Sequence, residues 1–269
     1  FCEQGPQIYG SSRSVMMRSL DLVMDVGNSR TKLALFAENR LLRMIHAENG
    51  DTDAVKALLG GDRPTGIVVG TTAADNEHYA EQLANIAPLL IVKGDTPTPL
   101  KSNYGTPLTL GADRLANAVG CLSRFPGRPV LAVDLGTCIT YDVVEKDGSY
   151  SGGAISPGLQ MRAMAMNAYS ARLPRVDPGP QPSPLGISTD SSLEAGIHYG
   201  ILGELKEFIA AYGQERPGIA VTLTGGDAPR FVSALKSGIF ALPFLTLEGL
   251  YAILIHNRTL HDSSVNAVR

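Results

Sequence analysis

Two short segments of the chain combine the residue types that bind phosphate. VMDVGNSRTKLALF (23–36) and AVDLGTCITYDVV (132–144) both read as an apolar run, an Asp-x-Gly turn, polar residues and a second apolar run. A glycine turn lets backbone amides point at an anion. Such internal repetition predicts two like-folded halves that face each other across a cleft, with one phosphate-binding turn on each side.

In the first segment, Asp25 ends a predicted buried strand, where its carboxylate is placed to hold a hydrated magnesium ion. The turn after it supplies hydrogen-bond donors and one positive charge, from Gly27, Asn28, Ser29, Thr31 and Lys32. These residues favour contact with the phosphates of a nucleotide. An ordinary β-turn with a solvated lysine is the alternative interpretation.

In the second segment, Asp134 also ends a buried strand, and Gly136 and Thr137 repeat the turn chemistry. A carboxylate buried there without a cation or donors would be costly, so we expect a partner for it. A third turn, VTLTGGD (221–227), would let a nucleotide lie against glycine backbone. The chain has neither a Walker A loop nor a GxGxxG turn after a strand, which disfavours a dinucleotide fold.

The segment GADR (111–114) places an acid and a base side by side where a loop enters a predicted helix. Asp113 could act as a general base and Arg114 as an anion clamp. The alternative is an Asp near a helix N-terminus beside an exposed Arg. SGGAISPGLQMRAM (151–164) could wrap a ligand or simply form a close turn from a hairpin into a helix.

The composition excludes several classes of function. Lys and Arg total 23 and Asp and Glu total 26, so the net charge of −3 argues against a nucleic-acid binder that neutralises phosphates. The three cysteines, Cys2, Cys121 and Cys138, lack the spacing of a metal site, and they fit a reducing, cytoplasmic setting. No apolar run approaches the ~18 residues of a membrane span.

The elements that must position these motifs alternate between strands and helices. Apolar runs predict buried strands at 20–27, 66–71, 89–93 and 129–137, and a hairpin that turns at Asp147 and Gly148. Helical spacing predicts helices at 51–60, 75–86, 112–124, 159–173, 191–213, 228–236 and 247–260. Residues 174–186, with five prolines, are predicted to form a surface loop. We divide the chain into a disordered leader (1–19) and two halves (20–125 and 126–269).

The motifs, taken in this order on a duplicated frame, resemble those of the type III pantothenate kinases. That family belongs to the superfamily of acetate and sugar kinases, Hsp70 and actin. The resemblance covers the chain from Leu20 to the final helix, with Ser29 where Thr is commoner and Cys138 where Ala is usual. It implies an α/β fold in which duplicated ribonuclease H-like (actin-like ATPase) domains flank a nucleotide cleft.

The resemblance also implies roles for individual residues. ATP would be bound by Asp25, Val26, Gly27, Asn28, Ser29, Arg30, Thr31, Lys32 and Thr137. Pantothenate would be held by Tyr104, Gly111, Ala112, Asp113, Arg114 and Thr189, of which Asp113 would be the catalytic base. Asp134 would bind a monovalent cation, potassium or ammonium. The implied reaction is phosphorylation of pantothenate to 4′-phosphopantothenate by ATP with Mg²⁺, the first step of coenzyme A biosynthesis.

The family is dimeric, with pantothenate at the subunit interface, and a homodimer is therefore expected. The predicted helices at 113–124 and 159–173 carry apolar residues on more than one face, so one face of each needs a second cover. A helix fully buried inside one large monomer is the alternative interpretation. Two alternatives remain: a sugar kinase of the same superfamily, and a non-catalytic relative that acts as a regulatory protein. Tyr104 beside GADR argues against a sugar kinase. The presence of Asp25, Asp113 and Asp134 argues against a non-catalytic relative.

Overall fold

The structure of the protein is a computed structural model, which describes residues 19–28, 30–71, 77–102, 104–179, 181–235 and 238–267. Of the predicted leader, residues 1–18 lie outside this described part of the chain, as does Ser29 of the first phosphate-binding turn.

Two mixed β-sheets repeat one strand order, as the internal sequence repeat predicts. The first sheet has the order β3-β2-β1-β4-β5 and the second β11-β10-β7-β8-β9-β6. The strands of the first sheet are β1 (Leu20–Val26), β2 (Thr31–Ala37), β3 (Arg40–Ala47), β4 (Gly66–Thr71) and β5 (Leu89–Val92). Those of the second sheet are β6 (Lys101–Ser102), β7 (Val130–Leu135), β8 (Cys138–Val144), β9 (Ser149–Pro157), β10 (Ala220–Thr224) and β11 (Ile239–Ala241). Each sheet therefore has an antiparallel three-stranded meander followed by two parallel strands, and β6 is an addition at the edge of the second.

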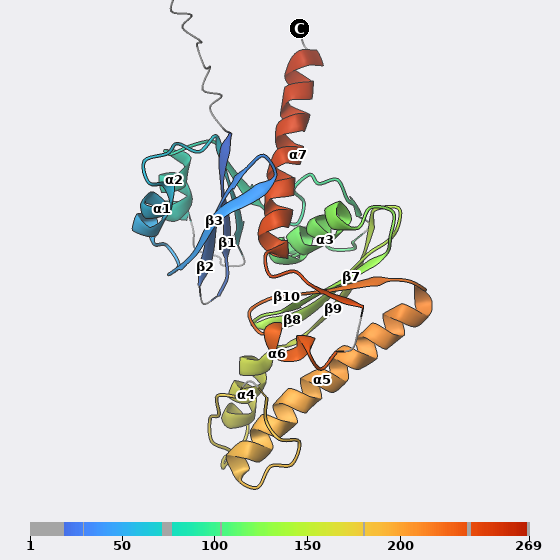
Figure 1. The fold of residues 1–269 in the computed structure, drawn as a ribbon. Helices are drawn as coiled ribbons and strands as arrows, with labels where there is room; N and C mark the ends of the chain where they lie inside the picture. Colours follow the sequence, from blue (N-terminus) through green and yellow to red (C-terminus); the bar gives the residue numbers. More distant parts are fainter. Residues whose placement is uncertain are drawn as a thin grey trace, which may run out of the picture.

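Helices cover both sheets in layers (Figure 1). The outer face of the first sheet packs against α1 (Thr52–Leu59) and α2 (Glu77–Ala84). Between the sheets, α3 (Ala112–Arg124) and α7 (Leu245–Ala267) share one core with both of them. The far face of the second sheet packs against α4 (Leu159–Ala168), α5 (Thr189–Glu215) and α6 (Pro229–Val232). A single 3₁₀ turn, η1 (Pro107–Thr109), precedes α3.

Two predicted helices are shorter in the structure than their apolar pattern indicates. The helix expected at 159–173 ends at Ala168, and the irregular segment that follows it packs Leu173 and Val176 on the core of the second sheet. That expected at 228–236 is a single turn, α6. By contrast, α5 begins at Thr189, earlier than predicted, because Ser188 and Ser191 form a reciprocal capping box that its apolar periodicity does not reveal.

The chain crosses between the two layers more than once. β6, from the first half of the sequence, pairs with β9 in the second sheet. α7, from the second half, packs on β1 and β4 of the first. α7 also packs along α3. The second packing partner that we expected for α3 is therefore another helix of the same chain. The division at residues 125 and 126 stays a prediction. Within the described ranges, no helix is long and apolar enough to span a membrane.

Candidate active site

A cleft of about 640 Å³ brings together the motifs that the sequence singled out. It is lined by the first turn, the loop before α3 and the start of that helix, the second turn, and the glycine pair after β10. The predicted site residues that line it are Asp25, Val26, Gly27, Asn28, Arg30, Lys32, Tyr104, Gly111, Asp113, Arg114, Asp134 and Thr137. Segments far apart in the chain thus meet in one cavity.

The first turn joins β1 to β2 and keeps a lysine next to an acid. Asp25 and Lys32 are paired across the hairpin, and the Lys32 Nζ lies 3.5 Å from Asp25 Oδ2. Burial raises the pKa of Asp25, while the charge of Lys32 opposes this rise. The charge of Asp113 adds to the rise, so acids from two motifs face one region of the cleft.

Asp134 lies at the equivalent end of β7. Asn117 Nδ2 of α3 donates a hydrogen bond of 2.9 Å to its Oδ2. Burial raises the pKa of Asp134 to about 6, although the Asn117 hydrogen bond and the charge of Lys32 both lower it. Asp113 and Asp25 add to the rise. Asp134 is half-buried, and a carboxylate that repels two neighbours gains from a cation, so its setting fits the cation site that we expect there.

Glycines let three turns approach each other around Asp134. A Cβ on Gly225 (φ +93°) would lie 2.4 Å from the Leu135 carbonyl oxygen and 2.5 Å from Asp134 Oδ1. A Cβ on Gly158 would lie 2.3 Å from the carbonyl oxygen of Gly136. The SGGAISPG segment therefore forms a close turn that supports the second phosphate-binding turn, whereas Gly225 and Gly226 line the cleft itself.

Arg114 is buried, so the alternative of an exposed arginine is wrong. Its Nη2 lies 2.7 Å from Asp142 Oδ1, to which Tyr150 Oη also donates a hydrogen bond of 2.6 Å. The guanidinium stands 5.8 Å from the centre of the Tyr104 ring. That ring in turn packs on Gly152 (φ +82°), where a Cβ would touch it at 3.4 Å. Arg114 and Tyr104 are thus held in place before any substrate binds.

Asp113 lies in the first turn of α3, beside the cleft. Its Oδ1 accepts a hydrogen bond from the backbone N–H of Arg114 and folds back over Gly111, where a Cβ would be only 2.4 Å away. Gly111 is therefore required for this position of the carboxylate. Asp113 lines the same cleft as the turns after β1 and β7, a position that suits a general base for a phosphoryl acceptor.

Three predicted site residues do not line the cleft. Thr31 is fully buried and donates a hydrogen bond to Asn49 Oδ1 (2.8 Å), and Ala112 is buried in α3. Thr189 is exposed at the start of α5, away from the lining. Ser29 cannot be placed because it is outside the described residues.

Sequence reasoning missed two asparagines that organise the site. Asn49 accepts from Thr31 and donates to the carbonyl of Gly27 (2.8 Å), so it closes the first turn from beyond the end of β3. Asn117 holds Asp134 from α3. Asn117 follows Asp113 by four positions, one helical turn on the same face, and this spacing is the only signal that could have indicated it.

The residues present suit a magnesium ion that keeps most of its water. Within the described ranges, no group of three or more His, Cys, Asp or Glu side chains could enclose a metal ion. Mg²⁺ in phosphate-transfer sites is commonly held by one or two carboxylates together with phosphate oxygens and water, and Asp25 provides one such carboxylate. The cleft therefore offers what phosphoryl transfer needs: glycine turns, one lysine, carboxylates for a cation and a separate acid at the acceptor side.

Comparison with known proteins agrees with this chemistry. A family model described as type III pantothenate kinase matches residues 21–211. The type III pantothenate kinase of Bacteroides fragilis (strain ATCC 25285) is 38% identical over 239 residues, which cover 88% of this chain and 98% of that protein. That of Christiangramia forsetii (strain DSM 17595) is 39% identical over 243 residues, 89% of this chain and 100% of that protein.

Solved structures extend the likeness at the level of fold. A conserved Campylobacter jejuni protein, described as belonging to a Baf family of transcriptional activators, superposes with a TM-score of 0.59 at 19% identity and covers 88% of this chain and 99% of that one. A ROK family glucokinase from Streptomyces griseus, solved with glucose and AMPPNP, superposes with a TM-score of 0.51 at 12% identity. The match covers 86% of this chain and 97% of that one. These likenesses confirm the predicted fold class, a duplicated actin-like α/β fold.

Proposed function

Because the chain belongs to the type III pantothenate kinase family, we propose that it transfers the γ-phosphate of ATP to pantothenate, yielding 4′-phosphopantothenate for coenzyme A biosynthesis. The observation that supports this most strongly is the single cleft that two phosphate-binding turns share with the GADR segment. A cytoplasmic setting fits the two described cysteines, Cys121 and Cys138, which are both free.

In the proposed mechanism the two turns hold the triphosphate. The N–H groups of Gly27 and Gly136 donate to the carbonyls of Arg30 and Cys138 and so close the two turns. Other backbone amides of these turns face the phosphates, and Lys32 supplies a positive charge. The Gly225–Gly226 backbone provides a surface without side chains against which the nucleotide lies. A magnesium ion held by Asp25 would neutralise charge that develops on the phosphate oxygens.

Asp113 is the proposed catalytic base. Its carboxylate accepts the proton of the primary hydroxyl of pantothenate as that oxygen attacks the γ-phosphorus in line. Arg114, fixed by Asp142, is placed to bind the carboxylate of the substrate, and Tyr104 forms a wall beside it. The position of the acceptor hydroxyl is therefore set by groups that are already rigid, and this lowers the entropic cost of alignment.

Asp134 is proposed to hold a monovalent cation, potassium or ammonium. The support is its half-buried carboxylate near Asp25 and Asp113, so that three acids face one cleft into which Lys32 brings a positive charge. A cation at Asp134 reduces this repulsion when the triphosphate adds its own negative charge.

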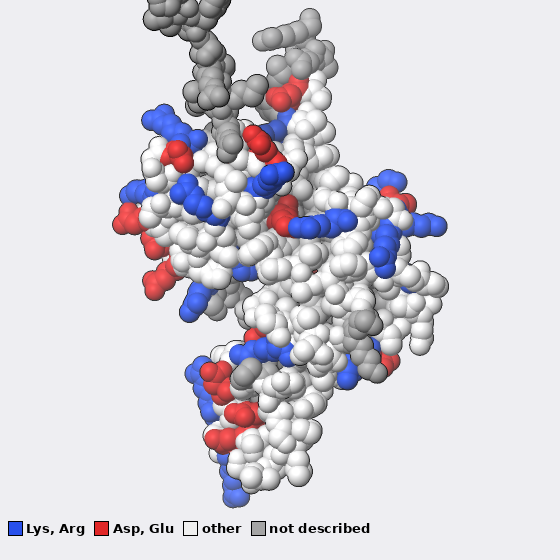
Figure 2. All heavy atoms as spheres, in the orientation of Figure 1, with Lys and Arg blue, Asp and Glu red and all other residues white. Residues whose placement is uncertain are grey.

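A homodimer is the proposed assembly. Exposed apolar side chains gather on α4 and just before α5, among them Met164, Tyr169 and Ile187, with Tyr169 92% and Ile187 93% exposed. Figure 2 shows this protruding end with charged side chains along one edge and few across the rest of the visible face. Thr189 lies beside this surface, so we propose that it contributes to the pantothenate site of a second copy of the chain.

The decisive experiment measures ADP release with pantothenate as acceptor, with and without potassium. Turnover that requires pantothenate supports the proposal, whereas turnover with hexoses alone would identify a sugar kinase. Light scattering on the same preparation tests the dimer. A monomeric mass with full pantothenate-dependent activity would exclude the role of Thr189 in a second copy.

A further inference from the structure

Asp134 is connected to the last helix of the chain through two buried polar side chains. Asn117 Nδ2 donates to Asp134 Oδ2 at 2.9 Å, and Thr246 Oγ1 donates to Asn117 Oδ1 at 2.8 Å. Asn117 is 1% and Thr246 4% exposed. Thr246 lies in the first turn of α7, 129 positions after Asn117. Both links are well within the range of ordinary hydrogen bonds.

The Asp134 carboxylate determines which way the Asn117 amide points, and the Thr246 hydroxyl anchors the opposite end of that amide. An asparagine side chain has one accepting and one donating end, which are nearly equal in size. If the amide were turned over, its oxygen would face the Asp134 carboxylate, and two acceptors would meet without a proton between them. The Asp134 carboxylate can only accept, so it selects the orientation in which the NH₂ group faces the acid, and the Thr246 hydroxyl holds the amide there by donating to Asn117 Oδ1.

This arrangement leaves the two oxygens of Asp134 with different tasks. Oδ2 is occupied by Asn117. Oδ1 lies between the glycine turns of the cleft: the Cβ that Gly225 lacks would be 2.5 Å from it, and that of Gly136 3.6 Å. The oxygen that faces the proposed ligand is therefore aimed by the hydrogen bond on the other oxygen.

We propose that Asn117 and Thr246 are positioning residues, which fix the rotation of the Asp134 carboxylate so that Oδ1 faces a cation between the two glycine turns. This inference rests on the proposed function, because it assumes that Asp134 holds a cation. It assigns α7 a part in ligand binding although Thr246 is not among the residues that line the cleft. The alternative is that the two side chains merely satisfy each other's buried polar atoms.

A pair of conservative variants at Thr246 separates these interpretations. Thr246→Val keeps the shape but removes the hydroxyl, and Thr246→Ser keeps the hydroxyl but removes the methyl group. Two binding readouts apply to the full-length protein: the Kd of a non-hydrolysable ATP analogue with Mg²⁺, from calorimetry, and the rise in melting temperature on adding potassium. Thr246→Val removes one hydrogen bond from the chain of contacts Thr246–Asn117–Asp134, which we call the relay. This loss should weaken nucleotide binding by about tenfold. It should also shrink the potassium effect, and Thr246→Ser should restore both.

Asn117→Asp provides a second variant of nearly equal volume, in which a carboxylate faces Asp134. We expect a loss of nucleotide affinity larger than that of Thr246→Val, in a protein whose circular dichroism confirms folding. Asp134→Asn is the reference for the cation site itself. If Asp134→Asn loses potassium-dependent stabilisation while Thr246→Val behaves as wild type, the relay is refuted and the proposed function stands. If Asp134→Asn itself responds to potassium as wild type does, Asp134 holds no cation, and the relay falls with that role.

Discussion

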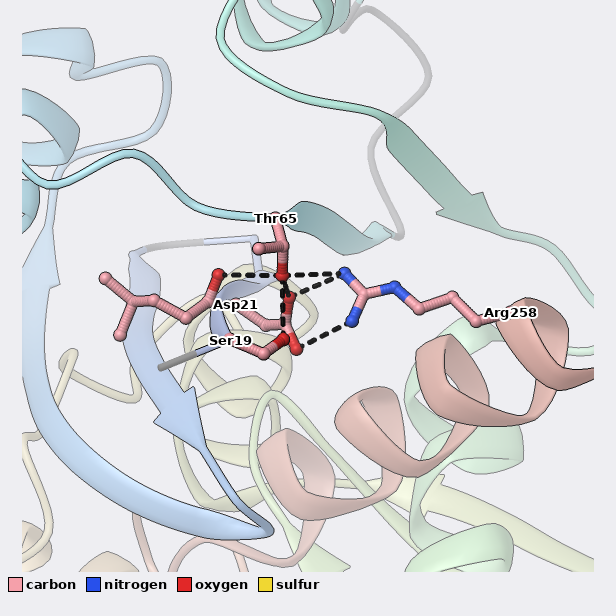
Figure 3. Close-up of polar contacts among 5 residues, drawn as sticks. Ser19, Asp21, Thr65 and Arg258 are labelled. Carbon is pink, nitrogen blue, oxygen red and sulfur yellow. Dashed lines mark hydrogen bonds and ion pairs between the residues drawn. The ribbon is translucent and has the colours of Figure 1, made fainter. Parts of the chain in front are cut away.

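Arg258 of α7 forms a two-pronged ion pair with Asp21 of β1, 237 positions earlier in the chain, with Nη1 2.9 Å from Oδ2 and Nη2 2.5 Å from Oδ1. Figure 3 shows the guanidinium pointing at Asp21, with Thr65 beside it. Thr65 Oγ1 donates a hydrogen bond of 2.7 Å to Asp21 Oδ1, the oxygen that Arg258 Nη2 also contacts. Asp21 is at the start of the strand that carries Asp25 near its other end. The pair therefore fixes α7 to the strand that carries an acid of the cleft.

Arg258→Met should destabilise the fold by about 2–3 kcal/mol. Removing one partner of a fully buried pair costs about 3–5 kcal/mol, because the other charge is left without compensation. Here the Asp21 side chain is 1% exposed but that of Arg258 is 30% exposed, so water reaches the site and the cost is lower. Urea unfolding measures the change in the free energy of unfolding.

Lys56→Met is the matched control, because Lys56 forms an ion pair with Asp53 on the surface of α1. We expect its effect to stay below about 0.5 kcal/mol. Equal effects of the two variants would contradict the idea that Arg258 anchors α7. Gly66→Ala offers an uncharged test, since its Cβ would lie 2.2 Å from Arg258 Nη2 and would displace the clamped guanidinium.

Asp113→Asn should lower kcat by roughly 10²–10⁴-fold with little change in melting temperature. An amide has the size of the carboxylate but cannot accept the proton of the substrate hydroxyl. The carboxylate's one described hydrogen bond is to the adjacent backbone N–H of Arg114, which contributes little to stability. Steady-state kinetics with pantothenate, together with a thermal melt, check the expectation.

Asp53→Asn in the first turn of α1 controls for the loss of a negative charge at a helix N-terminus. It should leave kcat unchanged. If Asp113→Asn retains more than about a tenth of wild-type kcat, a different group accepts the proton.

The sequence was sufficient to predict the site where its chemistry is local. Asp25 and Asp134 each follow an uninterrupted apolar run. Because such a run is buried as a strand, the polar residue that follows it is expected near the C-terminal end of that strand. The repeat of the same pattern predicted that two such strand ends face each other. The cleft that Asp25 and Asp134 share confirms this expectation.

The parts that could not be predicted depend on contacts between distant segments. Thr246 and Asn117 carry no local pattern that relates them, and their hydrogen bond exists only because α7 packs on α3. The early end of α4 at Ala168 has a similar cause. Helical spacing continues to residue 173, but Leu173 and Val176 pack on the core of the second sheet from an irregular segment, a placement that the local pattern does not reveal.

Asp134→Asn should make the protein more stable at neutral pH while abolishing turnover. The folded-state pKa of Asp134 is raised to about 6 by burial, above its unfolded value of 3.8. The folded state thus binds this proton more tightly, so the stability from the neutral acid is full below about pH 4 and is lost as the pH rises through 6. Above that pH the half-buried charge costs free energy, on the order of 1–3 kcal/mol, and an amide at this position avoids that cost.

Urea unfolding of Asp134→Asn and the wild type, without nucleotide or potassium, tests this sign. The variant should exceed the wild type in free energy of unfolding at a pH well above the folded-state pKa of about 6, and the difference should narrow below that pKa. A difference that stays constant across this range would show that Asp134 is not the titrating group. Saturating potassium should reduce the advantage of the variant, because a bound cation compensates the charge of the wild type.

Gly225→Ala and Gly226→Ala form the sharpest comparison in the cleft, since the two glycines are neighbours with opposite constraints. At Gly225 the backbone has φ +93°, and a Cβ would lie 2.4 Å from the Leu135 carbonyl oxygen and 2.5 Å from Asp134 Oδ1. At Gly226 nothing lies within 4 Å of the Cβ position. Alanine at 225 must therefore push the glycine turn away from Asp134, at a cost of roughly 1–3 kcal/mol of stability, and nucleotide affinity should fall with it.

Alanine at 226 should leave the free energy of unfolding within about 0.5 kcal/mol of wild type. Because Gly226 lines the cleft, the added methyl group should still weaken ATP binding if the nucleotide lies against this backbone. Unfolding and ATP-analogue titrations on both variants separate these effects. A Gly226→Ala variant that binds ATP as tightly as wild type would place the nucleotide elsewhere in the cleft.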